Sequence, residues 1–178
     1  MELITIHDRK FEPYISPEKI QDAVKAVADQ INRDYAGKEP VFLGVLNGAF
    51  MFAADLFKHL TIPCHISFVK LSSYAGTQST GQVKQLMGLT ENLAGRDIIV
   101  LEDIVDTGKT VEELKVLINL QNPATVKIAT AFDKPSCRKH SCEVNYAGLE
   151  LPDAFVLGYG LDYDGLGRNY PGLFKTIN

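Results

Sequence analysis

The stretch IIVLEDIVDTGKT, residues 98–110, decides the fold class of this chain. It opens with an uncharged aliphatic run, continues through acidic residues and closes on a Thr-Gly-Lys-Thr turn, after which residues 110–120 have helical spacing. A short, continuous apolar run is typical of a strand buried on both faces of a parallel sheet. Ligands bind at the carboxyl ends of such strands, so we expect the polar residues that follow to form a binding site.

The same alternation of strand and helix extends in both directions. Ser16-Pro17-Glu18 combines an N-cap residue, a first-turn proline and an acid, and apolar residues at helical spacing then predict a helix over residues 17–34. Residues 41–46 predict a buried strand that ends in an Asn-Gly turn before a helix over residues 51–60. Three more apolar runs predict strands: residues 66–71, 126–132 and 155–157.

This order of elements favours an α/β fold with a mainly parallel, twisted sheet flanked by helices. From residue 146 onward, short strand patterns follow one another without a long helix. We therefore expect the two chain ends to form a small hood lobe over the sheet. At ~150 residues per domain, the 178-residue chain predicts one domain, with a core at about 37–145 and a hood from the N-terminal segment and about 146–178.

Composition excludes several classes of protein. Hydrophobic residues make up 46% of the chain and charged residues 22%, which excludes a disordered chain or a coiled coil, and no apolar run reaches the ~18 residues of a membrane span. A net charge of -4 without long blocks of one sign disfavours nucleic-acid and membrane binding. The N-terminus lacks a secretory signal pattern, and the three cysteines form no CxxC, so we expect a cytoplasmic protein.

The polar end of the central stretch combines two kinds of groups. The turn at residues 106–110 offers consecutive backbone N–H groups, hydroxyls and a helix N-terminus, which suit a phosphate dianion. Glu102, Asp103 and Asp106 would repel that anion unless they hold Mg²⁺, bind sugar hydroxyls or accept a proton. The alternative is a solvated acidic loop before an ordinary helix. A Walker A loop is disfavoured, because Asp103 stands where that pattern requires glycine.

Two other segments allow more than one interpretation. Residues 72–82 are small, polar and too many for an ordinary connection, so they form either a dispensable hairpin or a functional lid. Cys137, His140 and Cys142 are possible metal ligands, but a fourth ligand is missing from the pattern and the spacing fits no common zinc site.

The pattern of residues 98–110, a hydrophobic strand, two acids, two hydrophobic residues, Asp, Thr-Gly and a hydroxyl-rich end, resembles the type I phosphoribosyltransferases. Among them it is most similar to the members that act on hypoxanthine and guanine, over about residues 43–168. The resemblance implies purine salvage: transfer of 5-phosphoribosyl from phosphoribosyl diphosphate to a 6-oxopurine, giving IMP or GMP and pyrophosphate. It also implies Mg²⁺ as cofactor and a homodimer or homotetramer.

The resemblance further implies a role for each residue of the central stretch. Glu102 and Asp103 would meet the ribose hydroxyls directly or through Mg²⁺, and Asp106 would be the catalytic base that faces N7 of the purine. Four residues would hold the 5-phosphate: Thr107, Gly108, Lys109 and Thr110.

Segments outside this stretch resemble the pyrophosphate site and the lid. Asn47 and Gly48 match the pyrophosphate loop, although many members have lysine where Asn47 stands, and Arg168 matches a pyrophosphate-binding arginine. Ser73 and Tyr74 match the Ser-Tyr pair of the loop that closes over the site, which favours the lid interpretation of residues 72–82.

The remaining matches concern the base and a second metal ion. Lys134 would bind the purine 6-oxo group, Phe155 would stack on the ring, and Val156 would offer backbone groups to its edge. Asp162 would lie near a second Mg²⁺, which makes Glu102, Asp103 and Asp162 the predicted metal ligands.

Two rival functions remain at the level of sequence. One is a sensor of nucleotides or of phosphoribosyl diphosphate that kept the pocket and lost the chemistry. The presence of Asp106 and the Ser73-Tyr74 pair disfavours a sensor, as does the absence of a helix-turn-helix pattern or basic tail. The other rival is a related transferase that acts on xanthine or a pyrimidine.

Overall fold

The computed structural model describes residues 2–75, 82–89 and 91–177. Within these residues the main sheet has six strands in the order β5-β4-β3-β6-β7-β8. Neighbouring strands are parallel except for the β4–β5 pair. The predicted parallel α/β sheet is therefore confirmed. Its strands are β3 (Val41–Val45), β4 (His65–Ala75), β5 (Gln82–Met87), β6 (Asp97–Val105), β7 (Thr125–Asp133) and β8 (Tyr146–Glu150).

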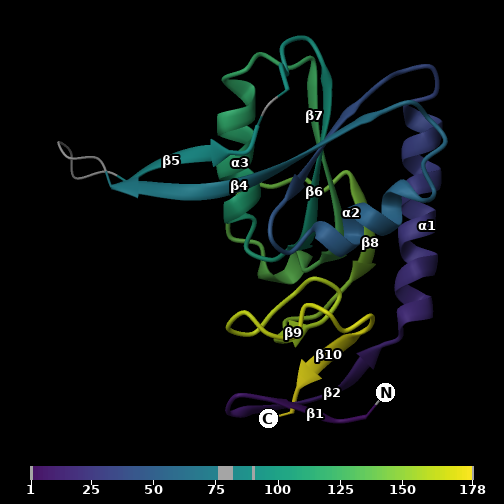
Figure 1. Ribbon diagram of the computed structural model, residues 1–178, viewed down its shortest axis with the longest axis vertical. Coiled ribbons are helices and arrows are strands. Elements are labelled where there is room, and N and C mark those ends of the chain that lie inside the picture. The colour runs from purple at the N-terminus through teal and green to yellow at the C-terminus, as the bar shows by residue number, and fades with distance from the viewer. Residues whose placement is uncertain (1, 76–81, 90, 178) are drawn as a thin grey trace.

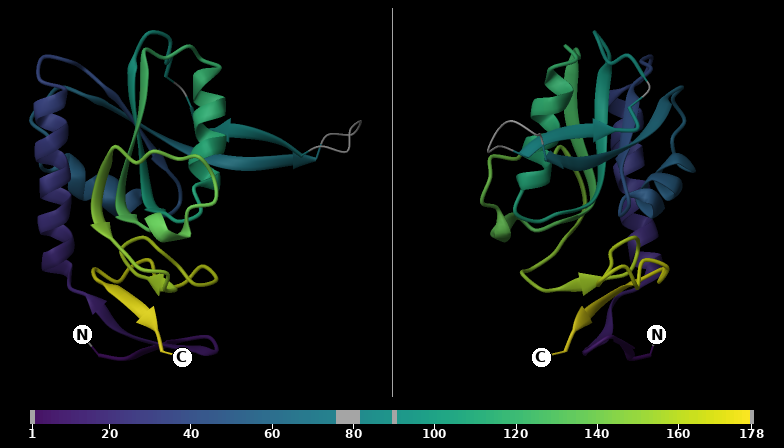
Figure 2. Two further views of the ribbon diagram at one scale, coloured as in Figure 1. Left: turned by 180° about the vertical axis from the view of Figure 1, so that it is seen from behind. Right: turned by 60° about the vertical axis from the view of Figure 1, so that its left-hand side comes forward.

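Helices cover both faces of this sheet (Figure 1, Figure 2). The helix α1 (Pro17–Asp34) has the predicted bounds, and its N-cap Ser16 accepts a hydrogen bond from the backbone of Lys19 at 3.4 Å. The helix α2 (Phe50–Phe57) lies with α1 on one face, and α3 (Lys109–Asn119) lies on the other. None of the described helices has the length and apolar character needed to cross a membrane.

Alternate residues of β6 are buried on opposite faces of the sheet. Ile99 and Leu101 pack on the side of α1 and α2, whereas Ile98 and Val100 pack on the side of α3. Because successive side chains of a strand point to opposite faces, the two acids that follow in β6 leave the strand in different directions.

A second, antiparallel sheet is built from both chain ends and forms the predicted hood (Figure 1). In the described part of the chain it has four strands in the order β1-β2-β10-β9. It lies beyond the carboxyl ends of the parallel strands, where β8 points toward it (Figure 2). The strands are β1 (Ile4–Ile6), β2 (Arg9–Ile15), β9 (Val156–Leu157) and β10 (Leu173–Thr176).

Several boundaries differ from those predicted. The helix α2 ends at Phe57 rather than at residue 60, and β4 runs past residue 71 to Ala75. Tyr146–Glu150, expected at the start of the hood, is a parallel strand of the main sheet, paired with β7. Its connection to β7 contains a single-turn 3₁₀ helix, Pro135–Cys137, so the helical spacing that usually signals a parallel crossover is absent from the sequence. The strand β6 also continues past residue 101 to Val105, because it stays paired with the end of β7.

Candidate active site

The turn between β6 and α3 forms a loop suited to phosphate. We call residues 106–110 the phosphate loop. Gly108 sits at its sharpest point with φ of +84°, a conformation that favours glycine, and α3 begins at the next residue. A pocket of about 250 Å³ is lined by residues 102–111. Backbone amides at a helix N-terminus are suited to bind a dianion, so the predicted 5-phosphate residues share one pocket.

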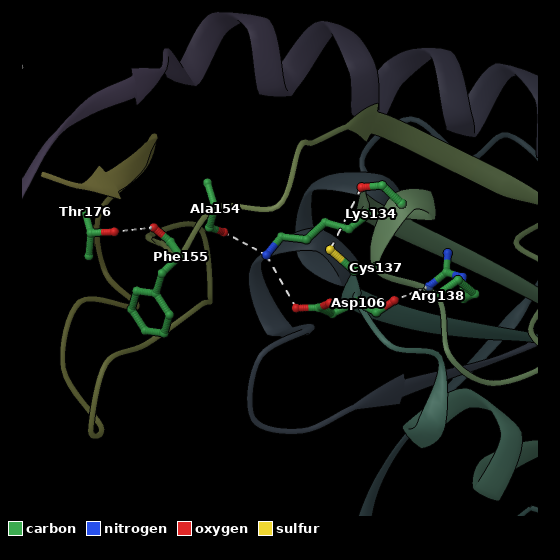
Figure 3. Close-up of polar contacts among 8 residues, drawn as sticks. Asp106, Lys134, Cys137, Arg138, Ala154, Phe155 and Thr176 are labelled. Atoms are coloured by element: carbon green, nitrogen blue, oxygen red, sulfur yellow. Dashed lines mark hydrogen bonds and ion pairs between the residues drawn. The ribbon is translucent and has the colours of Figure 1, made fainter. Parts of the chain in front are cut away.

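Lys134 and Asp106 meet at the junction of sheet and hood (Figure 3). Lys134 follows β7, and its side chain is only 6% exposed. Its Nζ donates to the carbonyl oxygen of Ala154 at 2.7 Å and lies 3.4 Å from Oδ2 of Asp106. An ammonium has three donors, so these two contacts leave one N–H for a ligand. The predicted base and the predicted 6-oxo-binding residue are thus neighbours.

A second pocket, of about 180 Å³, adjoins this pair. Phe155 lines this pocket and is 41% exposed overall, which is high for a phenylalanine in a folded protein. The Tyr163 ring packs against the Phe155 ring, edge to face, at a centroid distance of 5.6 Å. A half-exposed aromatic ring beside an ammonium and a carboxylate can stack on a flat polar heterocycle. The lining residues are Ile104, Asp106, Lys134, Phe155, Val156, Leu161 and Asp162.

Asp103 lies on the opposite side of β6 from Glu102, against the turn after β3. A Cβ added to Gly48 would overlap the Asp103 carboxylate, so this close approach requires glycine. The preceding Leu46–Asn47 peptide is cis, and Asn47 is exposed. Burial raises the pKa of Asp103, and nearby Arg168 partly opposes the increase. The predicted pyrophosphate turn therefore borders a predicted sugar-binding acid.

Arg168 and Asp162 form an ion pair on the hood side of the same region. Arg168 Nη2 lies 2.7 Å from Asp162 Oδ1, and Nη1 donates to the carbonyl oxygen of Gly160 at 2.7 Å. Asp162 also accepts a hydrogen bond from the backbone of Gly165 at 2.7 Å. A Cβ at Gly160 would overlap the carbonyl of Gly48, so the hood and the turn after β3 are in direct contact here.

Glu102 is an acidic side chain buried without compensation. It is 5% exposed, and its Oε1 has no hydrogen-bond partner among the described residues. Burial, together with the neighbouring Asp103, raises the pKa of Glu102 well above its ordinary value of 4.5. An unpaired buried carboxylate destabilises the fold, so a ligand that pairs with it would account for its presence.

We expect Glu102→Gln to stabilise the ligand-free protein in neutral and mildly alkaline buffer. Because the pKa is raised in the folded state, the folded protein holds this proton more tightly than the unfolded chain does. Ionisation of Glu102 therefore lowers the free energy of unfolding as the pH rises above about 4.5. The glutamine variant does not ionise and keeps this part of its stability. Urea unfolding of both proteins across this pH range measures the difference, with exposed Glu150→Gln as control. A free energy of unfolding that depends on pH identically in the wild type and in Glu102→Gln would refute this prediction.

The donor set suits Mg²⁺ only together with a substrate. Within the described ranges, no three His, Cys, Asp or Glu side chains gather into a metal site. The predicted ligands Glu102, Asp103 and Asp162 therefore do not make a closed three-carboxylate cluster, since Glu102 and Asp103 leave β6 on opposite faces and Asp162 pairs with Arg168. Mg²⁺ is commonly held by one or two carboxylates plus substrate phosphates, which these residues can provide for a bound diphosphate.

The lid lies largely outside the described residues. The backbone of Ser73 and Tyr74 belongs to β4 and pairs with Lys84 and Val83 of β5. Residues 76–81 are among those the structure does not describe, so the lid assignment stays a prediction.

Several supporting residues carry no motif and could not be recognised in the sequence. The Arg9 guanidinium lies 5.3 Å from the ring centre of Phe155 and 4.9 Å from that of Tyr163, which donates to Asp8 at 2.7 Å. Of these residues, only Tyr163 could be suspected from the sequence, because it directly follows the predicted metal ligand Asp162. On the other side of Asp106, Arg138 donates to the backbone of the phosphate loop.

Comparison with known proteins agrees with this arrangement. Residues 16–164 match the family model described as the phosphoribosyl transferase domain. A hypoxanthine-guanine phosphoribosyltransferase from Streptococcus thermophilus is 43% identical over 157 residues, 88% of this chain and 87% of that protein. An enzyme of the same name from Staphylococcus aureus is 38% identical over 167 residues, 93% of each chain.

Solved structures show the same likeness in three dimensions. A crystal structure of a hypoxanthine-guanine phosphoribosyltransferase from Bacillus anthracis has a TM-score of 0.84 and 39% identity, covering 93% of this chain and 98% of that chain. A hypoxanthine phosphoribosyltransferase from Staphylococcus aureus has a TM-score of 0.85 and 38% identity, covering 93% and 91%. With this fold, this strand-end loop and these relatives, the chain belongs to the phosphoribosyltransferase family.

Proposed function

We propose that the protein transfers the 5-phosphoribosyl group of phosphoribosyl diphosphate to hypoxanthine or guanine, giving IMP or GMP and pyrophosphate. The observation that carries this proposal is the meeting of Lys134 and Asp106 between the phosphate loop and the Phe155 pocket. The names of relatives at 38–43% identity support a purine-salvage function.

The base would lie in the pocket beside Phe155. Phe155 stacks on the ring, and the buried Lys134 ammonium donates to the 6-oxo group while Ala154 and Asp106 hold it in place. The strand β9 places the backbone of Val156 at the same pocket, where it can meet the edge of the purine.

The ribose 5-phosphate would occupy the neighbouring pocket. Amides and hydroxyls of Thr107, Gly108, Lys109 and Thr110 hold the phosphate, and the Lys109 ammonium adds positive charge. Glu102 and Asp103 accept hydrogen bonds from the ribose hydroxyls or hold Mg²⁺. The unpaired Oε1 of Glu102 supports this assignment, because a hydroxyl or a cation would satisfy it.

The leaving pyrophosphate would lie along the turn at Asn47 and Gly48, with Arg168 beside it. Glu102, Asp103 and Asp162 would each be able to hold Mg²⁺ together with the diphosphate rather than as one cluster, and the cation would supply positive charge to the leaving group. Asn47 has no positive charge. In this chain Arg168 therefore supplies a larger share of the positive charge beside the pyrophosphate than in family members with lysine at the turn.

Asp106 is placed to move a proton during the reaction. As the bond from ribose C1 to pyrophosphate breaks ahead of the new C–N bond, positive charge builds on the sugar, and the Asp106 carboxylate accepts the proton of the purine. Closure of the Ser73-Tyr74 lid would exclude water and prevent hydrolysis of the activated sugar.

The protein is expected to act in the cytoplasm as a homodimer or homotetramer. Its three cysteines are unpaired, which supports a reducing compartment. Light scattering of the purified protein measures the assembly.

The function is tested by incubating the protein with hypoxanthine, phosphoribosyl diphosphate and Mg²⁺ and identifying IMP and pyrophosphate by chromatography. We expect a chelator to abolish nucleotide formation and added Mg²⁺ to restore it, because the carboxylates near the predicted pyrophosphate turn cannot themselves neutralise the negative charge of the leaving group and would do so only through a bound cation. Equal rates with and without the chelator would exclude Mg²⁺ as cofactor. Binding of phosphoribosyl diphosphate without any nucleotide product would favour the sensor.

A further inference from the structure

We propose that Arg138 is a positioning residue that turns backbone amides of the phosphate loop toward the 5-phosphate. This inference rests on the proposed function of that loop, residues 106–110, as a phosphate site. Arg138 lies in the connection between β7 and β8, on the side of Asp106 away from Lys134 (Figure 3).

The Arg138 side chain links a strand to the loop. It is 17% exposed, and its Nη1 donates to the carbonyl oxygen of Asp106 at 2.7 Å. Its Nη2 forms an ion pair with Asp133, the last residue of β7. One nitrogen is thus held by a carboxylate on the main sheet while the other holds the first peptide of the phosphate loop.

The residues after Arg138 hold the next peptide in the same way. The backbone amides of Lys139 and His140 both donate to the carbonyl oxygen of Thr107 at 3.0 Å. A Cβ added to Gly108 would lie 3.0 Å from Cδ of Arg138 and 2.9 Å from Cβ of Cys142, so the loop rests directly on this segment.

The direction of these carbonyls sets the direction of the loop amides. In a trans peptide the C=O and N–H groups point in opposite directions. The carbonyl of Asp106 shares its peptide with the amide of Thr107, and the carbonyl of Thr107 shares its peptide with the amide of Gly108. When both carbonyls are held toward Arg138 and its neighbours, both amides face away from them. A peptide turned the other way would present a carbonyl oxygen to a dianion and repel it.

Arginine suits this position because of its shape. Its planar guanidinium presents several N–H donors in a fixed fork, so it bridges the Asp133 carboxylate and the Asp106 carbonyl at once. A lysine ammonium is a point donor that holds this geometry less firmly, and glutamine lacks the charge.

The test compares GMP with guanosine, which differ only in the 5-phosphate. Calorimetry gives Kd for both ligands, and the ratio of guanosine Kd to GMP Kd measures how much the 5-phosphate contributes to binding affinity. We expect Arg138→Gln to lower this ratio by about tenfold, because a charge-assisted hydrogen bond is lost and a loop amide is no longer oriented. Arg138→Lys should lower it by a smaller factor. Added guanidinium ion, below denaturing concentrations, should restore part of the ratio in Arg138→Ala.

A matched control is Arg96→Gln, since Arg96 donates a solvent-exposed hydrogen bond to the carbonyl oxygen of Glu39 at 3.3 Å. We expect its ratio to equal that of the wild type. An Arg138→Gln or Arg138→Lys protein that keeps the wild-type ratio, whatever its melting temperature, would overturn the inference and leave Arg138 a purely structural residue. Wild-type protein that binds GMP no more tightly than guanosine would instead overturn the phosphate site and the proposed function with it.

Discussion

Asp106→Asn is expected to lower kcat with hypoxanthine by roughly 10²- to 10⁴-fold while GMP binding is retained, because an amide keeps the shape of the carboxylate and cannot accept a proton. Asp106 lines both the phosphate-loop pocket and the Phe155 pocket, so it lies where sugar and base must meet. Steady-state kcat and the Kd of GMP, measured on the same preparation, separate the loss of chemistry from the loss of binding.

The control for this variant is Asp153→Asn. Asp153 is an exposed acid that lines a neighbouring pocket with Asp106, so it matches Asp106 in residue type and general location. We expect Asp153→Asn to keep the wild-type kcat. A decrease of less than about threefold in Asp106→Asn would mean that Asp106 is not the base.

Lys134→Gln is expected to lower kcat/KM for 6-oxopurines and to reduce the difference in kcat/KM between 6-oxopurines and adenine. The Lys134 ammonium has donors only, so it matches the 6-oxo group of hypoxanthine or guanine and leaves the amino group of adenine without an acceptor. A site built around one such buried bond can discriminate by up to ~10⁴- to 10⁵-fold. Phe155 cannot make this distinction, since stacking accepts any purine. A glutamine amide can present either its oxygen or its nitrogen.

The measurement is kcat/KM for hypoxanthine, guanine and adenine in the wild type and in Lys134→Gln. Lys127→Gln is a suitable control, because Lys127 lies at the other end of β7 and contacts Tyr146. An unchanged ratio of oxo to amino substrates in Lys134→Gln would remove Lys134 from base selection and leave that task to the backbone around Val156.

Local signals in the sequence predict most of the main sheet. Ser16 and Pro17 start α1 where expected because capping acts within one helical turn. The apolar run before Glu102 is a local signal as well. It predicts a buried central strand because burial on both faces of the sheet leaves no polar position. The family resemblance then places Asp106 and Lys134 in one site, and the structure brings them within 3.4 Å.

Features that depend on distant pairing were not predicted. The strand β6 extends past its apolar run because Ile104 and Val105 pair with β7, a contact that local hydrophobicity does not encode. Tyr146–Glu150 joins the main sheet for the same reason. Arg138 and Arg9 support the site through contacts with residues far away in sequence, and neither belongs to a motif.

The most direct test of the proposed function is the rate of nucleotide formation from a panel of bases, followed by ultraviolet absorbance with phosphoribosyl diphosphate and Mg²⁺ in excess. The panel comprises hypoxanthine, guanine, xanthine, adenine and orotate. Because Lys134 lines the Phe155 pocket and has an N–H left for a ligand, hypoxanthine and guanine should react with the highest kcat/KM, and adenine and orotate should be very poor substrates. A faster reaction with adenine or orotate than with hypoxanthine, or no turnover of any base, would contradict the assignment.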